Sequence, residues 1–300
     1  MGYNEFSRFT KYHSLIWRWL LPTLEATMNE KELDSWEDFE DELKGLFQLR
    51  EERNTSGIEP CSPFLFRGHK DSGWHLDSTL ERYTGCYYKF SQYYRLISAI
   101  KGQIETFAGV NWSIPSYEAY QDWLIQNDPF PPNEFPGYEY MLYLRHHGFP
   151  SPLLDWTRSP YIAAYFAYND VSSQSERVAI FAFLERGGHG KVGSTSKPSI
   201  IGLGQYIRGH SRHFFQQSQY TVCSVVKDGT YHYARHEDVF DLNMLNQDVL
   251  WKFTLPTSER KKVLKYLELY NINSFSLFGN EESLMESLAL KELYLRERDL

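Results

Sequence analysis

The sequence predicts one domain of mixed α+β class. Short apolar runs rich in Phe and β-branched residues are typical of buried strands, and they alternate irregularly with longer segments whose apolar residues recur at helical spacing. No repeat of fixed period and no low-complexity linker divides the 300 residues. Because no linker divides the chain, we expect one large domain rather than two, and a chain of this length can bury a core without disulfide or metal support.

The helices are expected where apolar spacing and end signals agree. Ser35 and Asp38 form a capping-box pattern ahead of a helix over residues 36–49. A glycine and then a proline follow the helix expected over residues 138–147, which is common stop chemistry. The proline-rich stretch 109–137 is expected to be irregular or to hold short helices. The remaining helices are expected at residues 9–24, within 78–107, and at 160–169, 258–271 and 284–295.

Four apolar runs predict buried strands. They cover residues 63–67, 178–184, 220–226 and 249–255. Gly68 is expected to end the first of them. The segment before residue 35 has a less clear pattern, so residues 1–34 are expected to form an N-terminal helical extension and residues 35–300 the domain itself.

The composition disfavours several classes of protein. The formal net charge is −8, from 31 Lys and Arg against 39 Asp and Glu, which is unusual for a dedicated nucleic-acid binder but does not exclude an enzyme that touches nucleic acid briefly. The three cysteines form no CxxC pair, so we expect neither a zinc cluster nor a disulfide framework. The chain starts without a signal-peptide pattern and its apolar stretches are too short to span a bilayer, so we expect a cytoplasmic protein with no membrane association.

Two motif-like patterns are weak. Residues 188–193 read GxGxxG after an expected strand, but the residues that follow are typical of a loop rather than of the helix that a dinucleotide site requires. A flexible glycine-rich loop is therefore the favoured interpretation. His232 and His236 lie four residues apart beside Glu237, but with no third ligand in the pattern a solvated turn is favoured over a metal site. No metal is expected.

The segment 66–69 leaves two interpretations open. Arg67 lies at the end of an expected buried strand, where its charge needs a partner. Either its guanidinium forms a fork for a phosphate or carboxylate ligand, or it forms a structural salt bridge with an acid such as Asp155. Spacing alone favours neither. Gly68 allows another group to approach the backbone closely.

Asp155 also has two interpretations. It stands between a short apolar pair and an expected helix, for which Thr157 or Ser159 is a candidate N-cap and Pro160 a first-turn residue. The carboxylate either stabilises this turn or lies at the mouth of a cleft together with Trp156 and Thr157.

Two long motifs in this order resemble the FRG domain family, named for its Phe-Arg-Gly tripeptide. The first is Phe66-Arg67-Gly68, and the second is the run 147–160, which contains HGxPxxLLDWTxSP. The match continues through the Ala- and aromatic-rich segment 163–167 and through residues 212–221, so the resemblance covers about residues 35–290. Pro152 departs from the family, which usually has Arg there. That departure removes a cation that could have paired with Asp155.

The resemblance implies an ADP-ribosyltransferase-like fold with a mixed sheet core and surrounding helices, and NAD as the substrate. Residues at the positions that match the family's pattern are implied to bind the cofactor: Arg67, Gly68, His69, His147, Trp156 and Phe166. A second set is implied to act in catalysis: Asp155, Thr157, Gln216 and Gln217. Arg67 and His69 are the expected cations for the pyrophosphate, and Trp156 is the first candidate for stacking on a ring.

The catalytic Glu of such folds has no obvious counterpart, because Gln216 and Gln217 stand where it is expected. These two glutamines are expected at the edge of the strand leading to Tyr220, facing the cleft. Asp155 is then expected to supply the negative charge that stabilises an oxocarbenium-like transition state, with Glu237 as the next candidate.

The resemblance therefore implies an ADP-ribosyltransferase-like effector that uses NAD to modify a macromolecule, either protein or nucleic acid. A toxin of a bacterial toxin–antitoxin or phage-defence system, with an antitoxin protein as partner, is the expected biological setting. The alternatives are a non-catalytic nucleotide- or partner-binding module of the same fold and an NAD hydrolase.

Overall fold

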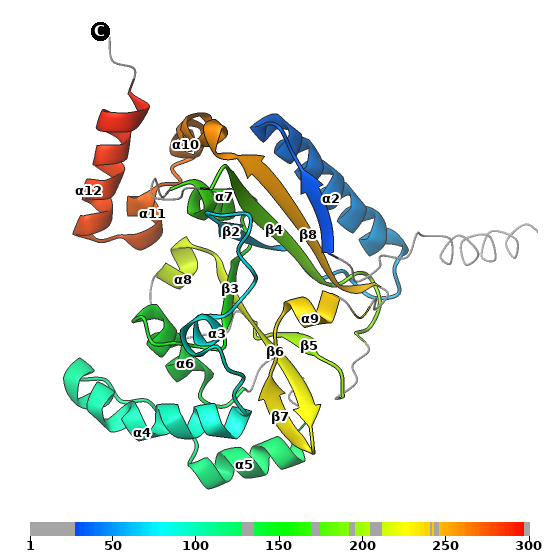
Figure 1. Ribbon diagram of the computed structural model, residues 1–300, viewed down its shortest axis with the longest axis vertical. Coiled ribbons are helices and arrows are strands. Elements are labelled where there is room, and N and C mark those ends of the chain that lie inside the picture. The colour runs from blue at the N-terminus through cyan, green and yellow to red at the C-terminus, as the bar shows by residue number, and fades with distance from the viewer. Residues whose placement is uncertain are drawn as a thin grey trace, which may run out of the picture.

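The computed structural model describes residues 28–127, 135–169, 175–191, 196–204, 212–240, 242 and 246–296. Within them the chain builds an eight-stranded mixed sheet surrounded by helices, so the predicted α+β class is confirmed (Figure 1). The strands are β1 (Met28–Glu32), β2 (Leu65–His69), β3 (Leu154–Thr157), β4 (Arg177–Arg186), β5 (Ser199–Gly202), β6 (Ser218–Lys227), β7 (Thr230–Tyr233) and β8 (Gln247–Pro256).

The strand order explains how distant motifs meet. The order is β1-β8-β4-β2-β3-β6-β5, with β7 also paired to β6. The β1–β8 pair is parallel and every other pair in this order is antiparallel. Strands β2 and β3 are neighbours at the centre, where Phe66 lies opposite Thr157. The two motif strands therefore lie side by side although about a third of the chain separates them.

The helices begin and end at local signals. They are α2 (Trp36–Ser56), α3 (Thr79–Thr84), α4 (Phe90–Ala108), α5 (Tyr117–Gln126), α6 (Tyr138–His146), α7 (Pro160–Tyr168), α8 (Arg212–Phe215), α9 (Glu237–Phe240), α10 (Arg260–Leu269), α11 (Ser274–Phe278) and α12 (Glu281–Ala289), with a π-helical turn at Leu290–Leu295. The predicted capping box of Ser35 and Asp38 is present, and Ser159 caps α7, which has Pro160 in its first turn. None of the helices in the described part of the chain is both long and apolar enough to span a membrane.

The core lies on both faces of the sheet. Alternate residues of β4 face opposite sides, so that Ile180 and Ala182 pack with α2, α7 and α10, whereas Phe181 and Phe183 pack with the α9 region. A third cluster joins α4, α5 and α6 to β6 at the other end of the molecule (Figure 1). Its aromatic rings stack closely, with 3.7 Å between the ring centroids of Tyr94 and Tyr120. Aromatic residues make up 17% of the sequence, and those of this cluster are used in packing.

Several expected element boundaries differ from the structure. The helix expected over residues 9–24 lies outside the described residues, but Met28–Glu32 is an edge strand of the sheet and not part of a helical extension. Strand β2 does not end at Gly68, which pairs with Ile180 and leads into His69. The expected strand at residue 63 begins only at Leu65. The helical stretch expected within residues 78–107 is divided into α3 and α4, which are separated by residues 85–89. The elements β1, β5, β7, α8, α9 and α11 are short or polar and carry too little periodicity to be predicted.

The glycine-rich segment forms a loop, as predicted. Residues 187–191 follow β4 without opening a helix, and residues 192–195 lie outside the described part. The Lys191 ammonium does not face a phosphate site, because it lies 2.7 Å from the carboxylate of the buried Asp248. The segment is therefore held by an internal ion pair.

Candidate functional site

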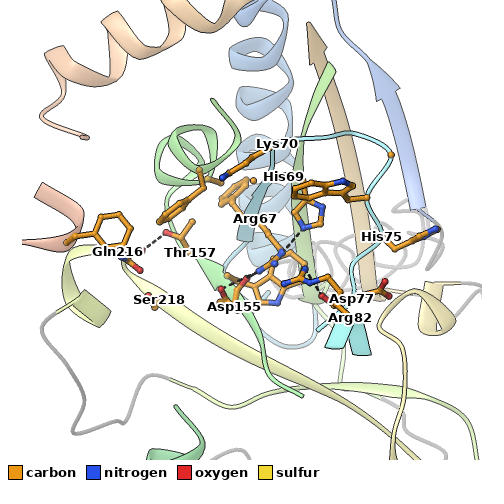
Figure 2. A pocket seen from close by; sticks show the side chains of 18 residues that line it. Arg67, His69, Lys70, His75, Asp77, Arg82, Asp155, Thr157, Gln216 and Ser218 are labelled. Atoms are coloured by element: carbon orange, nitrogen blue, oxygen red, sulfur yellow. Dashed lines mark hydrogen bonds and ion pairs between the residues drawn. The ribbon is translucent and has the colours of Figure 1, made fainter. Parts of the chain in front are cut away.

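A cavity of about 810 Å³ opens where β2 and β3 meet α7. Its wall combines the Phe-Arg-Gly strand, the Asp-Trp-Thr strand, one side of α7, the loop after β2, the turn before β6 and the end of α11. Figure 2 shows Arg67, Asp155 and Arg82 gathered in one part of it, with Thr157 and Gln216 together to one side. The two sequence motifs thus converge on one hollow.

Arg67 is fixed by three contacts. Its Nη1 donates to the Asp155 carbonyl oxygen at 2.6 Å and lies 3.6 Å from the Asp155 carboxylate, and its Nε donates to His69 Nε2 at 2.9 Å. The side chain is only 12% exposed, yet it lines the cavity. The salt bridge with Asp155 is therefore present, and the guanidinium also faces the space where an anion would bind.

Arg67 belongs to a cluster with excess positive charge. The pKa of Arg67 is lowered to about 10: burial is the largest cause, Asp155 raises the pKa, and repulsion from Arg145 and Arg82 lowers it. The guanidinium stays charged at neutral pH. Like charges held this close favour an anion between them.

Asp155 is held by two arginines. The Arg145 guanidinium contacts one carboxylate oxygen of Asp155, and Arg67 approaches the other. Burial alone would raise the pKa of this carboxyl group, but Arg145 and Arg67 lower it to about 2. Because 42% of the side chain is exposed, an ionised carboxylate faces the cavity.

Arg145 had no assigned role in the sequence analysis. It lies in the last turn of α6 and is held there by a 2.7 Å hydrogen bond from its Nη1 to Thr79 Oγ1. The absence of an arginine at Pro152 suggested that Asp155 lacks a second cation, and Arg145 supplies it. Nothing in the spacing along α6 indicates this contact, because it depends on how α6 packs beside β3.

His69 is a neutral acceptor rather than a second cation. It is 4% exposed, and burial together with Arg67 lowers its pKa to about 3. Its Nε2 accepts the hydrogen bond from Arg67 Nε, which requires an unprotonated nitrogen. The expectation that His69 supplies charge to a pyrophosphate is therefore wrong. Lys70 and Arg82 line the cavity instead.

Gly68 serves helix packing. A Cβ atom built at Gly68 would lie 1.9 Å from the Ala163 carbonyl oxygen and 2.8 Å from the Ala167 nitrogen, both in α7. The predicted close approach is present, and the group that approaches is a helix. By lying against β2, α7 forms one wall of the cavity through Ala163 and Phe166.

The predicted glutamines differ in position. Gln216 lines the cavity from the turn between α8 and β6, where its carbonyl accepts a 2.7 Å hydrogen bond from Thr157 Oγ1 and its Nε2 donates to the Leu277 carbonyl at 3.1 Å. Gln217 is exposed, has a φ of 48° and lies outside the cavity wall. Neither lies on the edge of β6 as expected, because the strand begins at Ser218.

Trp156 is not available for stacking on a ligand. The residue touches the cavity wall but is only 3% exposed. Its indole stacks on Phe183 at a centroid distance of 5.4 Å, and its Nε1 donates to Thr221 Oγ1 at 2.8 Å. Burial of the ring on the far side of β3 overrides the expectation from the motif.

Of the two remaining residues predicted to bind the cofactor, Phe166 lines the cavity and His147 does not. Phe166 lines the cavity and meets Phe278 edge-on at 6.2 Å between ring centroids, which makes an apolar wall. His147 ends α6, is exposed and lies beside the Tyr143 ring, outside the cavity wall. The structure thus does not bring His147 to the site.

His236 belongs to a buried hydrogen-bonded chain and not to a solvated turn. It is 1% exposed, and its Nε2 lies 2.9 Å from Thr221 Oγ1. The same Thr221 hydroxyl accepts a hydrogen bond from the Trp156 indole, which completes the chain. Burial, Arg67 and Lys191 lower the pKa of His236 to about 3. No group of three potential ligands for a metal occurs among the described residues.

We expect acid to destabilise the protein partly through His236. The unfolded histidine binds a proton as the pH falls below about 6.5, whereas the folded one stays neutral down to about 3. Unfolding is then favoured by up to about 1.4 kcal/mol per pH unit in this window. His236→Gln removes the titration, so its urea midpoint should fall less than that of the wild type between pH 7 and 5. His147→Gln is the exposed control, and parallel curves for H236Q and wild type would contradict the prediction.

Comparison with known proteins agrees with the placement of the motifs. No curated protein and no solved structure matches the chain. Residues 62–176, which contain β2, β3 and α7, match the family model of the FRG domain. The two motif strands and the helix that form the cavity wall thus lie within the segment that is similar to the FRG domain.

Proposed function

We propose that the cavity binds a nucleotide, with NAD as the expected ligand. The observation that carries this proposal is the excess of positive charge. The cavity wall holds Arg67, Lys70 and Arg82 against the carboxylates of Asp155 and Asp77, and Arg145 adds a further cation beside Asp155. A phosphate group placed beside Arg67 and Arg82 relieves their repulsion and accepts the charge-assisted hydrogen bonds that guanidinium groups favour.

The size and walls of the cavity fit such a ligand. Small-molecule sites commonly have volumes of about 300–1,000 Å³ and are largely apolar with a few oriented polar groups. The 810 Å³ cavity has Phe166 and Phe278 on one wall and the arginine cluster on another. It thus offers separate surfaces to an anionic group and to a ring.

Isothermal titration calorimetry of the full chain with NAD, ADP-ribose and inorganic pyrophosphate tests the proposal. We expect NAD and ADP-ribose to bind and their affinity to fall as the salt concentration rises, because the contacts are partly between charges. Absence of binding of all three compounds at millimolar concentration would overturn the proposal.

ADP-ribosyl transfer is the second candidate function, and the ionised Asp155 in the cavity favours it. In that reaction the bond between nicotinamide and ribose C1′ breaks, and nicotinamide leaves with the bonding electron pair. A lone pair of the acceptor then forms the new bond to C1′, and the acceptor loses a proton. A carboxylate near C1′ stabilises the positive charge that develops there. Arg67 and Arg145 offset part of this effect.

Asp155→Asn tests the transfer reaction. We expect turnover to fall at least about tenfold, because the lost charge acts mainly in the transition state. Affinity for NAD should stay equal or rise, since the cavity gains net positive charge. Steady-state kinetics and calorimetry on the same preparation separate the two effects. A transfer rate within a few-fold of the wild-type rate would remove Asp155 from this role.

Labelled NAD incubated with the protein and cell lysate separates the remaining alternatives. Label in protein or in nucleic acid identifies the acceptor, and free ADP-ribose indicates NAD hydrolysis. Binding without turnover supports a non-catalytic nucleotide-binding module. Gln216 favours this alternative, because its amide stands where a catalytic glutamate is expected and donates a hydrogen bond to the Leu277 carbonyl. A role as a toxin controlled by an antitoxin, or in phage defence, stays a prediction.

A further inference from the structure

We infer that Trp74 is the ring-stacking residue of the cavity and that Glu237 is the positioning residue that holds it there. This inference rests on the proposed nucleotide binding and narrows the ligand to a phosphate compound that carries an aromatic ring. It also moves Glu237 from a candidate charge-stabilising role to a structural one outside the cavity. Trp74 lies in residues 70–77 between β2 and α3, which are called the Trp74 loop below.

The Trp74 loop presents an indole at the cavity. Trp74 lines the cavity and is 52% exposed. An exposed indole leaves a large apolar surface in water, and tryptophan with one face open is common where proteins stack on ligands or partners. Trp156, the expected stacking residue, is buried, so Trp74 is the indole that has a ring face to offer.

Trp74 lies next to the anion-binding part of the cavity. Its ring centroid is 6.2 Å from that of His69, whose Nε2 accepts the hydrogen bond from Arg67 at 2.9 Å. A ring stacked on Trp74 would therefore lie within one nucleoside unit of a phosphate held by Arg67. This spacing fits a nucleoside phosphate better than an inorganic polyphosphate.

The N-terminal part of the Trp74 loop is fixed by hydrogen bonds within the loop and to β4. Gly73 N donates to Asp71 Oδ1 at 2.8 Å, and Trp74 N donates to the Asp71 carbonyl at 3.2 Å. Ser72 N donates to the Arg177 carbonyl at 3.0 Å, which ties the loop to β4. A tight turn thus sets the direction in which residue 74 leaves the chain.

Glu237 fixes the C-terminal part of the Trp74 loop from a distant part of the sequence. Its carboxylate accepts a hydrogen bond from Leu76 N at 2.9 Å and lies 2.9 Å from His75 Nδ1. Arg235 contacts the same carboxylate at 3.1 Å and Asp77 at 3.6 Å. Glu237 is separated from Leu76 by 161 positions and does not line the cavity.

Figure 2 agrees with this division of roles. His75 lies at the outer edge of the labelled group, away from Thr157 and Gln216, whereas Arg67 lies near its centre. Glu237 contacts His75 and does not itself line the cavity, so its direct partners are residues of the Trp74 loop and Arg235. We therefore expect Glu237 to influence binding through the placement of the Trp74 loop.

Variants of Trp74 test the stacking. Trp74→Leu should weaken NAD and AMP binding about tenfold, the order measured for base–aromatic stacking, and should leave inorganic pyrophosphate affinity within about twofold. Trp74→Phe keeps a ring and should stay within about threefold of the wild type for all three ligands. Tyr83→Leu is the matched control, because Tyr83 is 79% exposed on the neighbouring helix α3 and does not line the cavity. Unchanged NAD and AMP affinity in W74L would overturn the inference.

Glu237→Gln tests the positioning role without removing the side chain. Glutamine keeps an acceptor for Leu76 N but loses the charge that holds Arg235. NAD affinity should fall severalfold in E237Q and should not fall further when E237Q is added to W74L, because both act through one ring. An effect on pyrophosphate as large as that on NAD, or full additivity with W74L, would overturn the positioning role.

The outcomes distinguish this inference from the proposed function. If NAD and pyrophosphate bind W74L as tightly as they bind the wild type, the nucleotide site stands and the stacking role of Trp74 is wrong. Absence of binding of NAD, AMP and pyrophosphate to the wild-type chain removes both. Melting temperatures of each variant, measured alongside, show that losses of affinity occur in folded protein.

Discussion

Gly68→Ala is expected to destabilise the domain by about 3 kcal/mol or more, the upper part of the range for overpacking a core. The new Cβ would lie 1.9 Å from the Ala163 carbonyl oxygen, which is part of the α7 backbone. A helix backbone cannot rotate away as a side chain does, so α7 has to move from β2. Because Phe166 of α7 lines the cavity, ligand binding should be lost together with stability.

Chemical denaturation of G68A and wild type measures this effect. Gly102→Ala is the matched control, because Gly102 lies within α4 and a Cβ there meets no atom within 4 Å. That variant should gain roughly 0.5–1 kcal/mol from the better helix propensity of alanine. A G68A protein as stable as the wild type would show that α7 is not packed on β2 as described.

Arg67→Lys is expected to weaken nucleotide binding by about 1.5–3 kcal/mol, the range for hydrogen bonds to charged groups. This corresponds to roughly ten- to a hundredfold in the dissociation constant. Lysine keeps the positive charge beside Asp155 but lacks the planar fork that bonds Asp155, His69 and a phosphate at the same time. The charge that remains should keep the domain folded.

Calorimetry with NAD and with pyrophosphate checks the result, and both affinities should fall together because Arg67 acts on the phosphate. Arg158→Lys is the control, since Arg158 is exposed just after β3 and does not line the cavity. Equal NAD affinity in R67K and R158K would mean that Arg67 is only the structural partner of Asp155.

The sequence predicts the elements that carry a strong local pattern. Capping signals place α2 and α7, and apolar runs place β4, β6 and β8, since these strands are buried on both faces. Edge strand β1 reads MNEKE and is almost fully exposed, so it has no pattern that could reveal it. Its pairing with β8 depends on contacts more than 200 positions apart.

The site is predictable only where its residues belong to a motif. The motifs indicate that Arg67 and Asp155 belong together, and the structure brings both to the cavity. Arg145 and Glu237 act through tertiary contacts that have no signature in spacing. Trp156 belongs to the motif and lies beside the cavity, but its ring is buried in the core and cannot contact a ligand. Whether a side chain of β3 points to the cavity or to the core depends on the register of the strand. A shift of one residue would exchange the two faces.

The strand order determines whether residues 62–176, the segment that matches the family model, can fold without the rest of the chain. Residues 62–176 contain β2 and β3, but β4 begins at Arg177 and β6 at Ser218, so the long partners of both motif strands lie outside the segment. Cut out at those limits, the two strands would keep one paired position, Phe66 opposite Thr157, and expose their outer backbone edges. Such edges bind other chains readily. We therefore expect the matched segment not to fold by itself, because its two motif strands pair with β4 and β6 outside it.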